Sequence, residues 1–417
     1  MAGLLFVFLT PPFQVPDEVG HFWRASAIAE GYVVPSPGGA GSFVSIPEGT
    51  RMLVFFFYKD MARKPEVRIE WQQFRASWDL ALRPEERARV RVPAAYTPVA
   101  YAPQVVAAGL GRLLSLRPVI TFYLGRILNL FAFLGIVALA IRTTPRLKSF
   151  FAAAALLPMA LFLGGSWSPD AMTIASSFLF LALLLRGFPT GRNVAVTAGA
   201  GLLLGLCKPA YFLIALLAFP NAKKKRAAAV VILAATLAGV TLSMANAARA
   251  YERNAVPGVS PREQLAKIVQ DPLRFAEVLA VELRVHGFRY IEQMVGRLGM
   301  LEINQPLWLI WTEIAILAIC TGAAGGDLRP AVRIAGGLVF VLTAGALFLA
   351  FYLNWTTVGA DHIEGLQGRY FLPILPLVGV VAGASVAVLE RVSPRLVIAG
   401  AAICNTAAVI SVAQRFY

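Results

Sequence analysis

The sequence predicts an all-α integral membrane protein, a bundle of about eleven transmembrane helices in a single polytopic domain over residues 1–417. Of the 417 residues, 58% are hydrophobic and 15% are charged, whereas about a quarter of a soluble domain is charged. Apolar windows of about 20 residues, long enough to cross a bilayer core, recur from Pro118 to the end. The basic residues behind the net charge of +15 gather between these windows, a pattern that indicates membrane topology and no nucleic-acid partner.

Short basic loops set the predicted orientation. They lie at residues 142–148, 186–192, 223–226, 329–333 and, with fewer charges, 391–395. Because Lys and Arg collect in cytoplasmic loops, we place all five in the cytoplasm. The N-terminus is then inside and the C-terminus outside.

These loops order the predicted spans along the chain. The opening MAGLLFVFLTPPF is shorter than a span and indicates the exit half of a first transmembrane helix. A tight hairpin over 193–220 is expected to turn near Lys208. The other predicted spans are 118–141, 150–166, 171–187, 227–247, 306–322, 331–353, 370–389 and 396–414.

Three outer segments follow from this topology, at 12–117, 248–305 and 354–369. The span that begins at Pro118 must run inward, so the moderately apolar run 94–115 cannot cross the membrane. We expect this run to lie in the outer interface as a juxtamembrane helix. The first outer segment is the largest polar region of the chain.

The sequence Pro16-Asp17-Glu18-Val19-Gly20-His21 opens this first outer segment. Two adjacent carboxylates and a histidine one helical turn later can hold a divalent ion, such as Mg²⁺ or Mn²⁺, or supply a general base. We expect Asp17 and Glu18 to be catalytic and His21 to bind substrate. The alternative is a helix cap with an interfacial histidine, since acids are favoured in a first helical turn.

Two further charges lie at predicted outer turns. Asp170 follows Ser166-Trp167-Ser168-Pro169 and is a candidate metal ligand, or else part of a helix N-terminus. Lys208, at the turn of the hairpin, is expected either to contact a substrate phosphate or to extend to the membrane surface.

The third outer segment ends in Gln367-Gly368-Arg369-Tyr370. An arginine at this boundary offers a planar pair of donors for bidentate phosphate binding, unless an acid of the same loop pairs with it. Asp361 and His362 precede it and are expected to bind substrate. Arg297, before the span at 306, is a weaker candidate of the same kind.

Acids for proton or metal chemistry and cations for a lipid-linked phosphate, on one side of a membrane, are what sugar transfer from a polyprenyl-phosphate donor needs. The acidic pair, the long first outer loop and the second acid in a short turn resemble the GT-C class of integral membrane glycosyltransferases. The phrases TPPFQVPDEVGHFWRA, LPMALFLGGSWSPDAM, LLGLCKPAYFL and LQGRYFLP are similar to those of a bacterial domain-of-unknown-function family of predicted multi-pass membrane proteins grouped with that class.

The resemblance implies a bacterial inner-membrane enzyme with a periplasmic site. Asp17 or Glu18 would match the catalytic carboxylate of the first loop, Asp170 the second-loop acid used around a metal, and Arg369 the residue on the donor phosphate. The expected partners are the lipid-linked donor, an envelope glycan or lipid acceptor, and membrane lipids.

Two other functions fit the same pattern. A transporter or flippase of lipid-linked glycans would want charges at mid-depth in the spans, and runs such as 150–166 and 227–247 contain none. A non-catalytic subunit of envelope assembly is the remaining alternative.

Overall fold

The structure is a computed structural model that describes residues 1–38, 41–61, 64, 66–188, 190–222, 225–250, 257–323, 328–383 and 393–417. The helices of the N-terminal half are α1 (Ala2–Leu9), α2 (Glu18–Ala29), α3 (Glu48–Phe55), α4 (Tyr58–Met61), α5 (Trp71–Trp78), η1 (Pro98–Tyr101), α6 (Ala102–Leu113), α7 (Pro118–Thr143), α8 (Lys148–Leu156), α9 (Pro158–Gly164), α10 (Asp170–Arg186) and α11 (Gly191–Cys207). The later helices are η2 (Pro209–Leu217), α12 (Ala218–Asn221), α13 (Arg226–Ala250), α14 (Pro261–Gln270), α15 (Pro272–Val295), α16 (Leu307–Gly322), α17 (Pro330–Asn354), η3 (Gly368–Ile374), α18 (Leu375–Ala382) and α20 (Pro394–Phe416). The strands are β1 (Ser36–Gly38), β2 (Gly41–Pro47) and β3 (Arg87–Val92).

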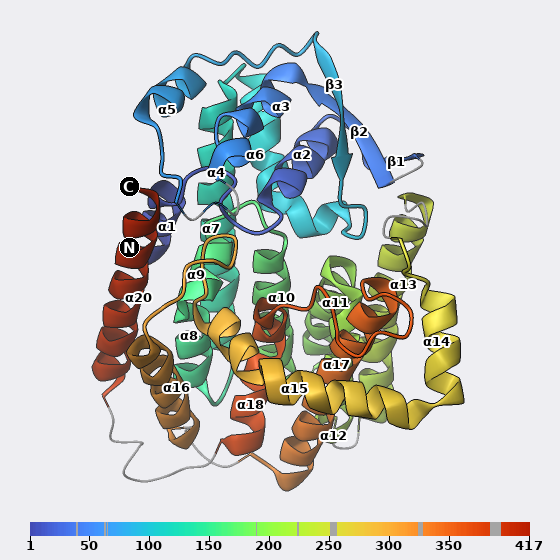
Figure 1. The fold of residues 1–417 in the computed structure, drawn as a ribbon. Helices are drawn as coiled ribbons and strands as arrows, with labels where there is room; N and C mark the ends of the chain where they lie inside the picture. The colour runs from blue at the N-terminus through green and yellow to red at the C-terminus, as the bar shows by residue number, and fades with distance from the viewer. Residues whose placement is uncertain are drawn as a thin grey trace.

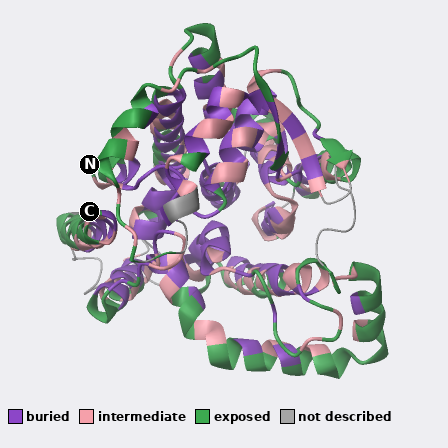
Figure 2. Cartoon of the chain, turned by 45° about the horizontal axis from the view of Figure 1, so that its top comes forward, coloured by how far each residue is buried: buried purple, intermediate pink, exposed green. Residues whose placement is uncertain are grey.

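The molecule has two layers, a helical bundle and a cap formed by residues 12–117 (Figure 1). The bundle helices run roughly parallel, α15 crosses in front of them, and the two termini lie close together (Figure 1). The bundle ends that carry the basic loops 142–148 and 186–192 point away from the cap (Figure 1). The core of the bundle is the most completely buried region of the chain, as the colouring by burial shows (Figure 2).

Four helices in the described part of the chain are long and apolar enough to cross a membrane, namely α7, α13, α17 and α20. Several other expected spans are shorter apolar helices. For example, the 16 residues of α16 extend about 24 Å, less than the roughly 30 Å hydrocarbon core. The structure therefore supports a membrane protein with several apolar helices, and the count of about eleven spans stays a prediction.

The expected span at 150–166 is two helices, α8 and α9. The break lies at Leu157, whose backbone is extended (φ −53°, ψ 137°). Pro158 follows it, and proline disfavours a helical conformation in the residue before it. The hairpin over 193–220 does turn near Lys208, which has an extended backbone (φ −158°) between α11 and η2.

The fold is mostly helical, as expected for a helical membrane protein, and the cap adds a three-stranded antiparallel sheet that the sequence did not predict. The side chains of β3 alternate between exposed arginines and buried Ala88, Val90 and Val92. Such alternation is the strand periodicity. The sheet lies within the polar first segment, where we expected only helices, and its buried face packs on α2.

The run 94–115 does not form one long helix. It contains η1 and the 12-residue α6, which at about 18 Å is shorter than the bilayer core. The inner side of α6, including Ala107, packs in the apolar cluster that also contains residues of α2 and α7. The helix therefore packs within the cap against α2 and the start of α7, and its expected position in the outer membrane interface stays a prediction.

A buried ion pair between Glu18 and Arg126 joins the cap to α7. The guanidinium donates to Glu18 Oε2 at 2.7 Å and to Oε1 at 2.9 Å, and both side chains are fully buried. Arg126 also donates to the carbonyl oxygens of Val7 and Thr10. The carboxylate in turn accepts from the backbone N–H of Trp167.

This position corrects the expectation that Glu18 is catalytic and a metal ligand. Its Oε2 also accepts from the N–H of Phe13 at 3.0 Å, so each oxygen has two donors. A carboxylate that is fully buried and fully hydrogen-bonded has no free lone pair directed at a substrate. Glu18 therefore holds the structure together beside the site.

We predict that Arg126→Met strongly destabilises the protein, by about 3–5 kcal/mol, because it leaves the Glu18 carboxylate buried without its partner. The comparison is Arg83→Ala, which removes an exposed pair with Glu86 (3.4 Å) and should cost about 0–1 kcal/mol. Thermal unfolding of the detergent-solubilised variants measures both. Equal melting temperatures for the two variants would contradict the structural role of the buried pair.

Candidate functional site

Asp17 lies at the entrance to α2, where the backbone of the chain turns sharply. Its φ of 63° is in the left-handed region, which aspartate tolerates better than most residues. Its carbonyl oxygen accepts the N–H of His21, while its side chain is 60% exposed. Because the neighbouring Glu18 is anchored by its buried contacts, the accessible carboxylate of Asp17 has a defined position.

Asp170 begins α10 after a short, internally bonded turn. Ser166 Oγ accepts the N–H of Ser168, and Ser168 Oγ accepts the N–H of Asp170. Asn129 of α7 donates to the carbonyl oxygen of Ser166 at 2.8 Å. Trp167, in the middle of the turn, is fully buried. The local serine contacts expected at a helix start are present, and they leave the Asp170 carboxylate free for other partners.

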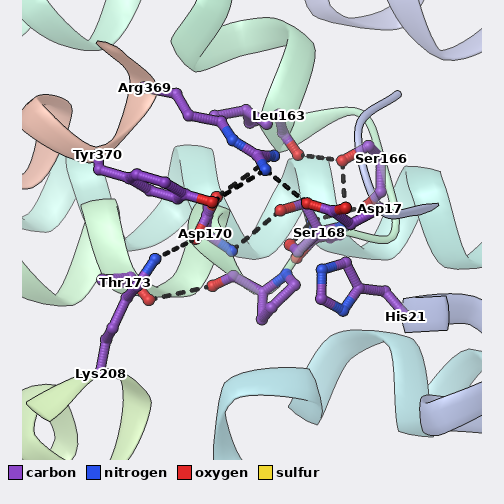
Figure 3. Close-up of polar contacts among 12 residues, drawn as sticks. Asp17, His21, Leu163, Ser166, Ser168, Asp170, Thr173, Lys208, Arg369 and Tyr370 are labelled. Atoms are coloured by element: carbon purple, nitrogen blue, oxygen red, sulfur yellow. Dashed lines mark hydrogen bonds and ion pairs between the residues drawn. The ribbon is translucent and has the colours of Figure 1, made fainter. Parts of the chain in front are cut away.

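Four charged residues that are far apart in the sequence meet in one place (Figure 3). Arg369 Nη2 donates to Asp17 Oδ2 at 2.6 Å, and Arg369 Nη1 lies 3.6 Å from Asp170 Oδ2. Lys208 Nζ donates to Asp170 Oδ1 at 3.1 Å. These residues, Lys208, Asp170, Arg369 and Asp17, form a row of alternating sign that we call the charge group.

Aromatic rings border the charge group, and the sequence analysis did not single them out. The Lys208 ammonium lies 4.1 Å from the centre of the Tyr370 ring and 5.6 Å from that of Tyr96. The Arg369 guanidinium is 5.1 Å from the Tyr370 ring. Such contacts stabilise a desolvated cation. Lys208 is therefore directed inward and does not extend to the surface. The position of Tyr370 directly after Arg369 was the available signal.

His21 lies beside the charge group (Figure 3) and is only 4% exposed. Its Nδ1 shares a hydrogen bond of 2.8 Å with Tyr101 Oη. Burial lowers the pKa of His21 to about 4, because the nearby carboxylates of Asp17 and Asp170 only partly offset the loss of water. His21 is therefore neutral at physiological pH, and its imidazole serves as a polar wall of the site.

The two positive and two negative charges of the charge group balance, but some of its hydrogen-bond donors lack acceptors among the described residues. Arg369 is 2% exposed, and its Nε and Nη1 have no hydrogen-bond acceptor among the described residues. Partial desolvation raises the pKa of Asp17, but the charge of Arg369 and its hydrogen bond lower it by more, so the pKa lies below its usual range. Asp17 is therefore an ionised, accessible carboxylate beside unused guanidinium donors.

The residues expected to bind a divalent ion do not fit one in this arrangement. Among the residues that the structure describes, no three His, Cys, Asp or Glu side chains gather as metal ligands. Glu18 is held by Arg126, and Asp17 and Asp170 both face the guanidinium of Arg369. The Arg369 guanidinium thus lies between the two carboxylates that would have to share a metal ion, so no step is assigned to a metal.

Other predicted substrate ligands lie outside the charge group. His362 is 53% exposed and pairs with Asp361 at 3.0 Å and with Glu364 at 3.1 Å. These hydrogen bonds raise the pKa of His362. Arg297 Nε donates to the carbonyl oxygen of Leu301 in its own loop. The hydrogen-bond partners of these side chains lie in their own loops, so the structure does not bring them to the charge group.

The loop that ends in Arg369 is held by side chains of α14 and α15. Gln293 Oε1 accepts the N–H of Gly368 at 2.7 Å, and Glu282 Oε2 accepts the N–H of Ile363 at 3.1 Å. Gln264 Oε1 accepts the N–H of Gly359 at 2.7 Å. Because Gly368 immediately precedes Arg369, the crossing helix α15 positions the guanidinium. Sequence reasoning missed these residues, since single Gln and Glu residues in an amphipathic helix carry no distinguishing pattern.

The neutral state of His21 predicts a specific pH dependence of stability. Its pKa of about 4 is below the value of about 6.5 in an unfolded chain, so the unfolded state binds more protons between these values. Stability should therefore fall as the pH drops from about 6.5 to about 4, by up to roughly 3 kcal/mol, and not change further from this cause. In His21→Gln this part of the pH dependence should disappear. The measurement is the melting temperature of both proteins across this pH range. If His21 were charged in the folded protein, the melting temperatures of both would change with pH at the same slope.

Comparison with known proteins identifies the family of the chain. Residues 1–378 match the model of the family described as predicted membrane protein (DUF2142). No curated protein and no solved structure matches the chain significantly. The matched range includes all four residues of the charge group and the neighbouring Tyr96 and Tyr370. The chain therefore belongs to the DUF2142 family of predicted membrane proteins.

Proposed function

We propose that this protein is a GT-C-like glycosyltransferase of the bacterial inner membrane, which moves a sugar from a polyprenyl-phosphate donor to an envelope glycan or lipid at the periplasmic face. One observation carries the proposal: an accessible carboxylate, Asp17, adjoins a buried arginine with unused donors and a second cation, Lys208. Sugar transfer needs a base and a cationic site for a leaving phosphate.

The two cations suit the phosphate of the donor. Arg369 Nε and Nη1 lack hydrogen-bond acceptors, and Lys208 Nζ uses one of its three protons on Asp170. A phosphate oxygen can accept from such donors in short, charge-assisted bonds. Because Asp17 and Asp170 hold both cations in place beforehand, little reorganisation is needed when negative charge develops on the leaving group.

Asp17 is the proposed general base. Its carboxylate takes the proton of the acceptor hydroxyl as that oxygen forms a bond to C1 of the sugar. The bond between C1 and the phosphate oxygen breaks in the same step, and the electron pair leaves with the polyprenyl phosphate. Ionisation of Asp17, which its lowered pKa ensures at neutral pH, keeps the base ready to accept the proton.

One buried residue favours the transport alternative. Glu313 of α16 is fully buried, and neither carboxylate oxygen has a charged partner or a nitrogen or oxygen donor among the described residues. An ionisable residue within a membrane-spanning segment is typical of transport proteins. Loss of lipid-linked glycan movement in Glu313→Gln, with no sugar turnover by the native protein, would favour a transporter over the enzyme.

We predict that Asp17→Asn lowers sugar transfer by at least about 100-fold, the range of a lost general base. The assay is release of label from radiolabelled polyprenyl-phosphate sugars to envelope fragments by the full chain in liposomes. Asp79→Asn, an exposed carboxylate of the cap, is the matched control and should keep full activity. Full activity in Asp17→Asn, with an unchanged melting temperature, would refute the role of Asp17.

We further predict that Arg369→Lys weakens binding of polyprenyl phosphate by about tenfold or more, because a lysine lacks the Nε and Nη1 donors that the guanidinium keeps beside its bond to Asp17. Lys208→Met should weaken it as well. Arg262→Gln, an exposed arginine of α14, tests the nonspecific effect of charge removal and should bind normally. Calorimetric titration in detergent measures the affinities, and equal loss in all three variants would contradict a specific phosphate site.

A further inference from the structure

A row of arginines occupies the exposed face of β3. Arg87, Arg89 and Arg91 are exposed, while Ala88, Val90 and Val92 are buried. Because successive side chains of a strand point to opposite faces, the three guanidiniums share one side of the sheet. The other side packs against Ala27 of α2, the helix that carries His21.

Two of these arginines have no acidic partner in the part of the chain that the structure describes. Arg87 pairs with Glu30 at 2.6 Å, whereas Arg89 and Arg91 are not within ion-pair distance of any carboxylate in the described ranges. The Arg89 guanidinium instead lies 4.4 Å from the centre of the Phe43 ring. Two cations on one small surface without counter-charges attract an anionic ligand.

The local backbone keeps these two side chains close to the sheet. A Cβ atom at Gly38 would lie 2.8 Å from Arg89 Nη2, and one at Gly41 would lie 2.5 Å from Arg91 Nε. The absence of a side chain at Gly38 and Gly41 thus leaves space for the guanidiniums to lie along the surface. Held side chains lose less conformational entropy on binding than free ones do.

The strand leads from the outer part of the cap toward the charge group. β3 runs down toward the bundle, from Arg87 at its far end to Val92 (Figure 1). Tyr96 follows shortly after, with its ring centre 5.5 Å from the His21 ring and 5.6 Å from Lys208 Nζ. The five backbone steps from Arg91 to Tyr96 can span at most about 18 Å.

We infer that Arg89 and Arg91 bind the acceptor, and that this acceptor is an acidic glycan with carboxylate or phosphate groups along its chain. The inference rests on the proposed function and names its acceptor class. An arginine pair on a strand that leads to Asp17 can hold the charged chain while its end reaches the site. The far end of β3 rises away from the bundle (Figure 1), which favours a polymer outside the membrane over lipid headgroups.

The arginines also lie on an edge strand, since the described sheet has the order β1-β2-β3. Charged side chains on an edge prevent pairing with other chains. That role alone would make a variant without the arginines aggregate but would leave glycan binding unchanged. The two explanations therefore predict different outcomes for the same variant.

The test is calorimetric titration of the full chain, in nanodiscs of neutral lipid, with oligogalacturonate as the acidic probe and a neutral dextran oligomer as its comparison. Oligogalacturonate should bind, more weakly at high ionic strength, and the dextran should not. Arg89→Gln with Arg91→Gln should weaken the binding about tenfold or more. Arg75→Gln with Arg112→Gln, which removes two exposed arginines of the same cap outside the row, should not.

Equal affinity of the double variant and the native protein for oligogalacturonate would overturn the inference. A second result would also overturn it: the protein binds no glycan, but it binds vesicles of anionic lipid in a way that depends on Arg89 and Arg91. That result would assign the arginine row to the membrane surface. If the native protein binds the glycan through Arg89 and Arg91 but transfers no sugar, the acidic-glycan site stands and the proposed reaction fails.

Discussion

The buried pair of Glu18 and Arg126 is the interaction on which the rest of the site depends. A carboxylate and a guanidinium without access to water remain stable only when their hydrogen bonds are satisfied. Here the satisfying groups are the backbone of residues 7–13 and the N–H of Trp167. One ion pair thus joins the segment before Asp17, the helix α7 and the turn before Asp170.

The two carboxylates of the site therefore take their positions from an acid that does no chemistry itself. Asp17 is next to Glu18 in the chain, and Asp170 is three residues after Trp167. Arg369, from the opposite end of the sequence, lies between these two carboxylates. Its position is held by Gln293 of α15, which accepts the N–H of the preceding Gly368. The alternating row of charges is stable because each ion has an opposite neighbour, and two nitrogens of Arg369 still lack hydrogen-bond acceptors among the described residues.

The cap and the bundle contribute different properties to this site. The bundle supplies Asp170, Lys208 and Arg369, mounted on helices whose apolar faces are buried. The cap supplies Asp17 and His21, together with the aromatic rings of Tyr96 and Tyr101 that exclude water from the imidazole. Its arginine row on β3 adds a surface that reaches outward from the site.

The sequence by itself determined that the chain is an apolar membrane protein, where most of its long apolar helices lie, and which charges gather at one end of them. Apolar length, basic loops, and prolines at breaks such as Pro158 are local properties, so they can be interpreted without a fold. The candidate residues Asp17, Asp170, Lys208 and Arg369 stood out because charges beside apolar runs are costly.

Only the tertiary structure separated Glu18 from Asp17, although the two are adjacent in the chain. Their different environments depend on Arg126, more than a hundred residues away, and no local pattern encodes that contact. The same holds for the positioning of Arg369 by Gln293 and for the sheet of the cap, whose strands β2 and β3 pair across about forty residues. Long-range pairing decides which of two similar acids is buried and which stays exposed at the charge group.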